Sequence, residues 1–323
     1  MSRIAIVTGG ARGIGRGCAL ELAARGYDIA LVDLLEPEMK RTAGEIEALG
    51  RKTLAYKADV ALFDRAHEVV DDVARQWGSI DFLLNDAGAS NAKGILEIKE
   101  EEFDRTIAVN LKSCFNYIHA TAPIMLKQDQ GGRIVSMSSL NALSGGVTSA
   151  VSKHSYAAAK AGILGLTWST ANALAKYGVT TNAILPSGAT RMIDSTPRGR
   201  QVFEETGKWP SEQAKGTERD PDNVAPLVVY LASDAAAGIN GQTFHSFLYG
   251  YTVLAQPQAI RRLDANRRLT PAELVKLVPK TLGADLVGPP GTNFGRELDK
   301  RPAGEWKDLE SGVRFWQWPR EER

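Results

Sequence analysis

The chain has 323 residues, of which 43% are apolar, so it is long enough to bury a large core in one domain or two. Its formal net charge of +1 argues against nucleic acid or an anionic membrane surface as the main partner. Two isolated cysteines argue against a disulfide framework, and the four histidines show no metal-ligand spacing, so no metal is expected. No apolar run has the length of a membrane helix, and the first strand leaves no room for a signal peptide, so we expect a cytoplasmic protein.

The amino terminus has the pattern of a strand, a glycine turn and a helix. Residues 3–7 are apolar and β-branched, which predicts a buried strand. Gly9, Gly13 and Gly15 follow, and then a helical pattern that ends at Gly26. In this context glycines permit a tight turn, and the helix amino terminus presents N–H groups to a pyrophosphate. An ordinary turn between strand and helix is the alternative, although it rarely needs three glycines so spaced.

A second apolar run, residues 28–32, ends in Asp33, which lies 18 residues after Gly15. An acid at about this distance accepts hydrogen bonds from the adenosine ribose of a dinucleotide. Because its charge repels a 2′-phosphate, Asp33 favours NAD over NADP. Arg12 favours NADP instead, since a cation in the glycine turn could bind that phosphate. A second alternative is that Asp33 is only a turn residue at the end of a strand.

Apolar runs near residues 3, 28, 53, 81, 133 and 178 alternate with helical patterns. This alternation predicts an α/β fold with a doubly wound parallel sheet. Ligands of such sheets bind at the carboxyl ends of the strands.

Tyr156 and Lys160 lie four positions apart in a helical pattern, so they share one helix face. A cation that close to a phenol favours the phenolate, which makes the pair suited to proton exchange near neutral pH. By itself, the same spacing is also typical of a solvated helix face.

Together these motifs resemble those of the short-chain dehydrogenase/reductase family, in the family's order and over roughly residues 3–245. Residues 8–15 match the pattern Thr-Gly-x-x-x-Gly-x-Gly. Residues 85–88 are similar to the family's Asn-Asn-Ala-Gly, with Asp86 in place of the second Asn, and residues 133–139 resemble the strand that ends in the catalytic serine. The resemblance implies a small-molecule substrate and a homo-dimer or homo-tetramer.

The resemblance also implies roles for single residues. Tyr156 exchanges a proton with the substrate oxygen, Lys160 supports the phenolate and holds the nicotinamide ribose, and Ser139 hydrogen-bonds the same substrate oxygen. Asn110 resembles the residue that holds a water linking Lys160 to solvent. The residues expected to bind the cofactor, NAD, are Gly9, Arg12, Gly13, Ile14, Gly15, Asp33, Asp59, Val60, Asn85, Ala87, Gly88, Tyr156, Lys160, Pro186 and Ala189.

Two departures from the family pattern lie on the substrate side. Ser139 and Tyr156 are 17 residues apart, where the family usually has about a dozen, so we expect a loop insertion between them. Ser139 is the expected catalytic serine because it ends the strand, and Ser144 is the alternative if the loop folds back. Ser187 replaces a glycine in the family's segment under the nicotinamide.

Residues 1–256 form the expected NAD-binding domain, and residues 191–222 lie where the family carries its substrate lid. Cations in this segment could meet an anionic substrate, or they could pair with the segment's own glutamates. These cations are Arg191, Arg198, Arg200 and Lys208.

The chain continues beyond the family's usual end as an extension over residues 257–323. Thr270 is expected to cap a helix that begins at Pro271. Late aromatics argue against a disordered tail, so we expect the extension to pack on the core or on a neighbouring subunit. These aromatics are Trp306, Phe315, Trp316 and Trp318.

Two classes of function stay open. The first is an NAD-dependent oxidoreductase of secondary alcohols or ketones; the stretch 186–192 is similar to one in (3R)-3-hydroxyacyl-CoA dehydrogenases, which hints at such a substrate. The second is a catalytically silent, NAD-binding scaffold, because a fold does not imply a function. The presence of Asn110, Ser139, Tyr156 and Lys160 together favours the enzyme.

Overall fold

The computed structural model describes residues 2–90, 93–145, 153–257, 262–265 and 267–282, together with the backbone of 307–310 and 313–315. Its strands are β1 (Arg3–Thr8), β2 (Tyr27–Asp33), β3 (Thr53–Lys57), β4 (Phe82–Asn85), β5 (Gly132–Met137), β6 (Val179–Pro186), β7 (Thr243–Phe247), β8 (Gly250–Leu254), β9 (Lys307–Glu310) and β10 (Val313–Phe315).

The α-helices are α1 (Gly13–Ala24), α2 (Glu36–Ala48), α3 (Phe63–Trp77), α4 (Glu100–Ile107), α5 (Ser113–Lys127), α6 (Asn141–Ser144), α7 (His154–Leu174), α8 (Arg191–Asp194), α9 (Pro197–Thr206), α10 (Pro210–Gln213), α11 (Ala225–Ala232) and α12 (Pro271–Leu277). A π-helical segment, η1 (Ala108–Lys112), joins α4 to α5. Short 3₁₀ segments are η2 (Ala175–Tyr177), η3 (Pro221–Val224), η4 (Asp234–Ala236) and η5 (Val278–Lys280).

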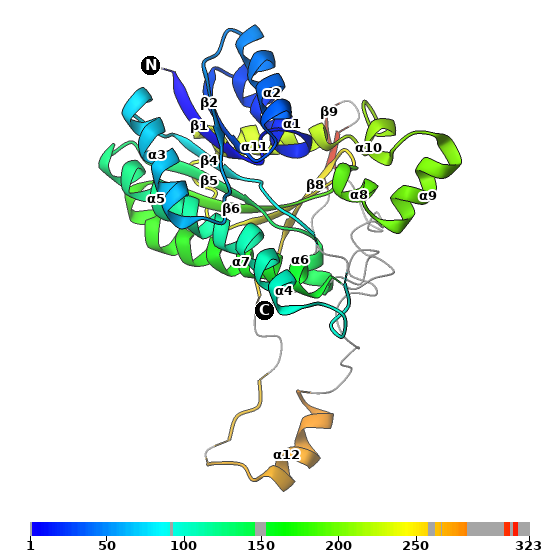
Figure 1. Cartoon of the computed structure of the whole chain (residues 1–323). Helices are drawn as coiled ribbons and strands as arrows, with labels where there is room; N and C mark the ends of the chain where they lie inside the picture. Colours follow the sequence, from blue (N-terminus) through cyan, green and yellow to red (C-terminus); the bar gives the residue numbers. More distant parts are fainter. Residues whose placement is uncertain are drawn as a thin grey trace.

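The main sheet has the strand order β3-β2-β1-β4-β5-β6-β7-β8 (Figure 1), and all its neighbours are parallel except β7 and β8. The order reverses direction at β1, where β2 and β3 lie on one side and β4 onward on the other. This is the doubly wound topology that the alternation of apolar runs predicts, so the fold prediction is confirmed. Such a sheet places its ligand cleft outside the strand carboxyl ends, at the reversal.

Helices cover both faces of the sheet (Figure 1), and each face has its own apolar core. On one face α1, α2 and α11 contribute Leu22, Ile46 and Leu231, all fully buried. On the other face α3 and α5 contribute Val70 and Tyr117, which are also fully buried. The inner strands β1, β2 and β4 are buried over almost their whole length and form continuous apolar runs in the sequence, whereas the edge strand β3 is only partly buried.

β8 was not expected from the sequence. It pairs antiparallel with β7 through a two-residue turn formed by Leu248 and Tyr249. Such turns need positive φ, which Gly, Asn or Asp usually supply. Here Leu248 adopts φ 54°, so no Gly, Asn or Asp marks the turn in the sequence.

Two segments expected to be loops contain helices. The insertion before Tyr156 holds the single turn α6, and α7 already begins at His154; residues 146–152 of that insertion lie outside the described part of the chain. The expected lid, residues 191–222, consists of α8, α9, α10 and η3. The short helices α8 and α10 carry no periodic apolar stripe, so nothing in the sequence marks them.

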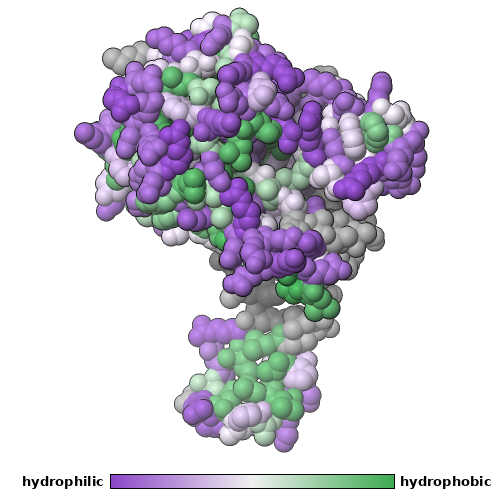
Figure 2. Space-filling model, in the orientation of Figure 1, coloured by the Kyte–Doolittle hydropathy of each residue, from purple (hydrophilic) through white to green (hydrophobic). Residues whose placement is uncertain are grey.

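The carboxyl-terminal extension contains the predicted helix α12. Thr270 caps it, and its hydroxyl accepts a hydrogen bond from the Glu273 N–H. In Figure 1 α12 stands away from the sheet, and Figure 2 shows apolar surface over it. Leu274 and Val275 are 39% and 74% exposed. The side chains of the four late aromatics lie outside the described residues, so packing of the extension stays a prediction.

Candidate active site

A cleft of about 1480 Å³ opens at the carboxyl ends of β1 to β6. In Figure 2 the surface is hollowed between the main body and the lid helices. Ligand pockets for one small molecule usually measure roughly 300–1000 Å³. The cleft therefore has room for a dinucleotide and a substrate together.

The glycine turn forms the floor of the cleft at the start of α1. Gly9 has φ +73°, and a Cβ there would lie 2.8 Å from the Ala87 nitrogen. A Cβ on Gly15 would lie 2.3 Å from the Gly9 carbonyl oxygen. Arg12 precedes α1 in an extended conformation, and no side chain caps the helix. Arg12 thus offers no side-chain acceptor to the first N–H groups of α1, while the Gly15 N–H hydrogen-bonds the Asp86 carboxyl. Free N–H groups at this end of the helix are expected where a pyrophosphate binds.

Asp33 ends β2 and lines the cleft, as predicted. Its carboxylate accepts hydrogen bonds from the N–H groups of Ala11 and Leu35, both at 3.1 Å. It therefore shapes the turn and also faces the place expected for an adenosine ribose. Arg12 and Arg41 line the same part of the cleft, so both signs of charge are present there.

Most of the predicted cofactor residues line the cleft. Gly15 and Asn85 do not; Asn85 is buried behind the wall, where its amide donates to the Ser136 hydroxyl at 3.2 Å. The predicted residues on the wall are Gly9, Arg12, Gly13, Ile14, Asp33, Asp59, Val60, Ala87, Gly88, Tyr156, Lys160, Pro186 and Ala189.

Tyr156 and Lys160 lie on one face of α7 and both line the cleft. The Lys160 ammonium lies 5.5 Å from the centre of the Tyr156 ring. It also donates to the Met137 carbonyl oxygen at 2.6 Å. Both residues are more than nine-tenths buried, so only a small part of each is exposed, on the side of the cleft.

Ser139 follows β5 and lines the cleft, while its neighbour Ser138 is turned inward and donates to the Lys160 carbonyl oxygen at 2.7 Å. The Ser139 hydroxyl accepts from the Asn141 N–H at 3.2 Å. Ser144, the alternative from the sequence, is fully buried at the end of α6 and does not line the cleft. The geometry therefore favours Ser139 over Ser144.

Asn110 lies in the π-helical segment η1, directly behind the cleft wall. Its amide nitrogen donates to the carbonyl oxygens of Ala89 and Thr106, both at 2.8 Å. Its amide oxygen is buried and has no protein partner among the described residues. A Cβ on Gly88 would lie 2.8 Å from this oxygen and 3.5 Å from the Lys160 ammonium. The unpaired oxygen thus lies near Lys160, on the side where a bridging water is expected.

Asp86, the departure from the family's Asn-Asn-Ala-Gly, lines the cleft beside the start of α1. A Cβ on Gly15 would lie 2.8 Å from its Oδ2. Burial raises the pKa of this carboxyl to about 7, although the Lys160 charge and the Gly15 N–H act in the opposite direction. A titratable acid therefore stands where an amide is usual.

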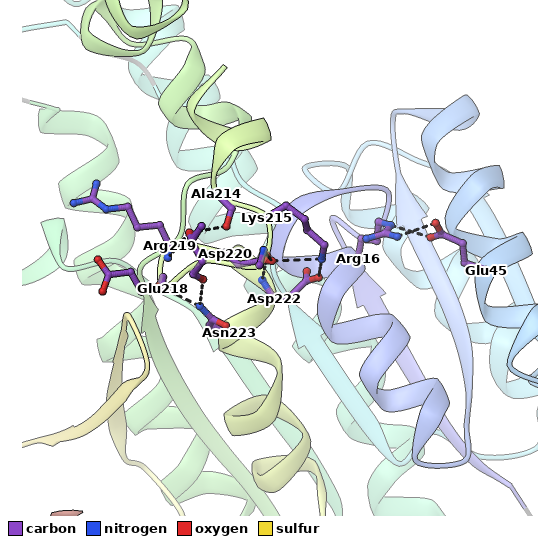
Figure 3. Close-up of polar contacts among 11 residues, drawn as sticks. Arg16, Glu45, Ala214, Lys215, Glu218, Arg219, Asp220, Asp222 and Asn223 are labelled. Atoms are coloured by element: carbon purple, nitrogen blue, oxygen red, sulfur yellow. Dashed lines mark hydrogen bonds and ion pairs between the residues drawn. The ribbon is translucent and has the colours of Figure 1, made fainter. Parts of the chain in front are cut away.

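The lid is joined to the glycine-turn helix through a polar cluster (Figure 3). The Lys215 ammonium pairs with Asp222 and lies 3.5 Å from Asp220. Asp222 in turn packs against Gly17 of α1, where a Cβ would lie 2.3 Å from its Oδ1. The end of the lid is thereby fixed to α1, the helix that follows the glycine turn.

The structure also brings cations to the cleft that the sequence did not single out. Lys153 and Arg219 line it, together with the predicted Arg191. None of the salt bridges among the described residues pairs these cations with an acid, or pairs the lid's Arg198, Arg200 and Lys208 with its glutamates. Lys153 precedes Tyr156 by three positions, a helical spacing that could have identified it.

Comparison with known proteins decides the family. The family model described as enoyl-(acyl carrier protein) reductase matches residues 9–246. The 3-oxoacyl-[acyl-carrier-protein] reductase of Staphylococcus epidermidis is 38% identical over 251 residues, which cover 76% of this chain and 97% of that protein. The chain belongs to the short-chain dehydrogenase/reductase family. It is thus an oxidoreductase of a family that acts on CH–OH groups.

Further family members act on different molecules, according to their names. The 2-dehydro-3-deoxy-D-gluconate 5-dehydrogenase of Escherichia coli is 31% identical over 75% of this chain and 92% of its own. A short chain dehydrogenase from Mycobacterium avium has a TM-score of 0.76 and 32% identity, over 89% of this chain and 97% of its own. The carveol dehydrogenase of that organism, solved in complex with NAD, has a TM-score of 0.66 and 25% identity, over 75% and 95%.

None of the helices in the described ranges is both long and apolar enough to cross a membrane.

Proposed function

We propose that this protein is an NAD(H)-dependent dehydrogenase or reductase that interconverts a secondary alcohol and a ketone. The observation that carries the proposal is that Tyr156, Lys160 and Ser139 meet on one wall of the cleft whose floor is the glycine turn. A bound nicotinamide supplies the hydride acceptor or donor. The protein's own residues hold the substrate oxygen and move its proton.

In oxidation of the alcohol, Tyr156 as phenolate accepts the proton of the substrate hydroxyl, and a bound nicotinamide would take up the hydride. The Lys160 ammonium lies 5.5 Å from the centre of the Tyr156 ring, where its positive charge attracts negative charge on the phenol oxygen. Ser139 donates a hydrogen bond to the substrate oxygen, which keeps the carbinol carbon oriented and stabilises negative charge on that oxygen. Reduction uses the same groups in reverse, with Tyr156 as the acid.

The proton then leaves the phenol through the Lys160 ammonium and a water at Asn110. The unpaired Asn110 amide oxygen supports this route, since such a buried acceptor usually binds water. Without the Asn110 contact, Lys160 would have to exchange its proton directly with the cleft.

NAD rather than NADP is the proposed cofactor. The Asp33 carboxylate at the end of β2 is placed to accept from a ribose hydroxyl and to repel a phosphate. Two similar structures of mycobacterial family members were solved with NAD. Arg12 and Arg41, on the same wall, are the residues that would argue for NADP.

A 3-oxoacyl or 3-hydroxyacyl thioester, such as a (3R)-3-hydroxyacyl-CoA, is the second candidate for the substrate. It is favoured by the 38% identical relative from Staphylococcus epidermidis, whose name describes a 3-oxoacyl-[acyl-carrier-protein] reductase. We also propose a homo-dimer or homo-tetramer, on the family resemblance alone, and a cytoplasmic location, because two isolated free cysteines fit a reducing compartment.

The test is to follow reduced nicotinamide by absorbance while NAD or NADP is offered with secondary alcohols that include 3-hydroxybutyryl-CoA. We expect turnover with NAD and a loss of about 10²- to 10⁴-fold in kcat for Tyr156→Phe. The variant should still bind NAD, because the phenol hydroxyl is needed only for the proton. Tight NAD binding with no turnover of any alcohol by the wild type would favour the silent scaffold.

A further inference from the structure

A second lysine lies beside the proposed catalytic tyrosine. The Lys153 ammonium is 6.0 Å from the centre of the Tyr156 ring, nearly as close as the 5.5 Å of Lys160. Lys160 occupies the inner side, where it donates to the Met137 carbonyl oxygen. Lys153 instead precedes the first residue of α7 and lines the cleft. The two cations therefore approach the phenol from different positions on the helix, and of the two only Lys160 has an acceptor among the described residues.

The environment of Lys153 leaves its charge uncompensated. The residue is only partly exposed, and burial lowers the pKa of its ammonium. No carboxylate among the described residues pairs with it. The first turn of α7 has no acidic residue, and the positive end of a helix dipole adds to the charge there. A desolvated cation without a partner is costly, and an anionic ligand would remove that cost.

The other charged side chains on the cleft wall show the same excess of positive charge around Lys153. Every acid that lines the cleft precedes β5 in the sequence: Asp33, Glu38, Asp59 and Asp86. From Met137 onward the lining side chains include no acid among the described residues, and the cations there are Lys153, Lys160, Arg191 and Arg219. The half of the cleft left for the substrate is thus positively charged, which favours an anionic molecule.

We propose that Lys153 is a specificity-determining residue that binds the carboxylate of an oxo-acid or hydroxy-acid substrate while the reacting oxygen lies at Tyr156. This inference rests on the proposed function and names its substrate class. A carboxylate fits better than a distant phosphate because Lys153 lies against the tyrosine ring itself. An anion bound there is only a few bonds from the reacting carbon.

The alternative is that Lys153 only packs its aliphatic stem on the tyrosine ring. The chain offers a matched control for this. Lys176 also lies over a tyrosine ring, 4.9 Å from the centre of Tyr177, but it is exposed and does not line the cleft. Lys176→Gln removes the same charge and the same kind of ring contact outside the site.

The experiment compares oxo acids with their neutral methyl esters. Pyruvate, acetoacetate and 4-oxopentanoate place the carboxylate one, two and three bonds from the reacting carbonyl carbon. We measure kcat/KM with NADH for each acid and its ester in the wild type and in Lys153→Gln, Lys153→Arg and Lys176→Gln. For the acid that the wild type prefers, Lys153→Gln should lower the acid-to-ester ratio about 10- to 100-fold through KM. Lys153→Arg should restore most of that ratio, and Lys176→Gln should leave it unchanged.

Equal losses on acid and ester in Lys153→Gln would overturn the inference, since they would indicate a packing role. A wild type that prefers every ester would also overturn it, while leaving the proposed function intact. If the wild type reduces neither acids nor esters, the proposed function fails for these compounds. The role of Lys153 is then tested by measuring carboxylate binding. Acetoacetate is then titrated into NAD-loaded protein; equal or undetectable affinity in the wild type and Lys153→Gln would refute the inference.

Discussion

The two halves of the cleft are built from different parts of the chain. The nucleotide half is largely backbone: a glycine turn, strand ends and the uncapped amino terminus of α1. The substrate half is largely side chains, carried by α7 and by the short helices α6, α8 and α10. We expect the first half to bind groups that all dinucleotides share and to tolerate little change. The second can vary in length and charge while the fold stays the same, which is how one family acts on many substrates.

The largest effect is expected where backbone atoms come closest. Gly15→Ala would place a methyl group 2.3 Å from the Gly9 carbonyl oxygen and 2.8 Å from the Asp86 carboxylate. The turn must move, so we expect NAD affinity to fall about 100-fold or more and the free energy of unfolding to drop by about 1–3 kcal/mol. Calorimetric titration with NAD and urea unfolding measure the two effects.

Gly44→Ala is the matched control for this substitution. Gly44 is exposed on α2, and a Cβ there would meet nothing within 4 Å. It should bind NAD as the wild type does and gain about 0.5–1 kcal/mol in the free energy of unfolding. Unchanged NAD affinity in Gly15→Ala would mean that the dinucleotide does not lie on this turn.

A smaller effect is expected at the adenosine end of the nucleotide half. Asp33→Asn keeps one of the two oxygens that accept from the Ala11 and Leu35 N–H groups and removes the charge, so the preference for NAD over NADP in kcat/KM should fall about 10- to 100-fold. Arg12→Gln tests the opposite expectation. If Arg12→Gln lowers turnover with NADP and Asp33→Asn leaves the cofactor preference unchanged, then Asp33 is only a turn residue. Arg12 would in that case bind the 2′-phosphate of NADP.

The nucleotide half could be predicted because its requirements are local. Glycines at fixed spacing, an acid at the end of the second strand and the Tyr156–Lys160 pair each follow from a short-range geometric need. The inner strands of the parallel sheet could be predicted as well, since strands buried on both faces form continuous apolar runs. Most of the residues predicted to bind the cofactor line the cleft, except Gly15 and Asn85, and their binding of NAD stays a prediction.

The substrate half could not be predicted to the same degree, because tertiary contacts rather than local propensity form it. The lid helices α8 and α10 are single turns, and the sequence suggested a loop. Lys153 was not predicted because the tyrosine–lysine pattern places its lysine four positions after Tyr156, whereas Lys153 lies three positions before it. The strand β8 escaped notice because its turn uses Leu248 at positive φ in place of a glycine.

The smallest predicted effect concerns Asp86, the one residue of the nucleotide half that departs from the family pattern. Burial raises the pKa of this carboxyl to about 7, while Lys160 and the Gly15 N–H lower it and Asp33 adds to the increase. The unfolded chain titrates this group near 4. The folded protein therefore holds the proton more tightly, and the stability that the protonated carboxyl contributes is lost as the pH rises from about 4 to about 7.

Asp86→Asn replaces the acid with the amide usual in the family and cannot ionise. Its free energy of unfolding relative to the wild type should increase by about 1–2 kcal/mol between pH 5 and pH 8, measured by urea unfolding without cofactor. Asp104→Asn, an exposed position on α4, gives the reference for losing one surface charge. If the two variants respond to pH alike, the Asp86 carboxyl is solvated in the folded protein. The close packing around Gly15 would then not include the Asp86 side chain. That side chain would be as free to move as one in the substrate half.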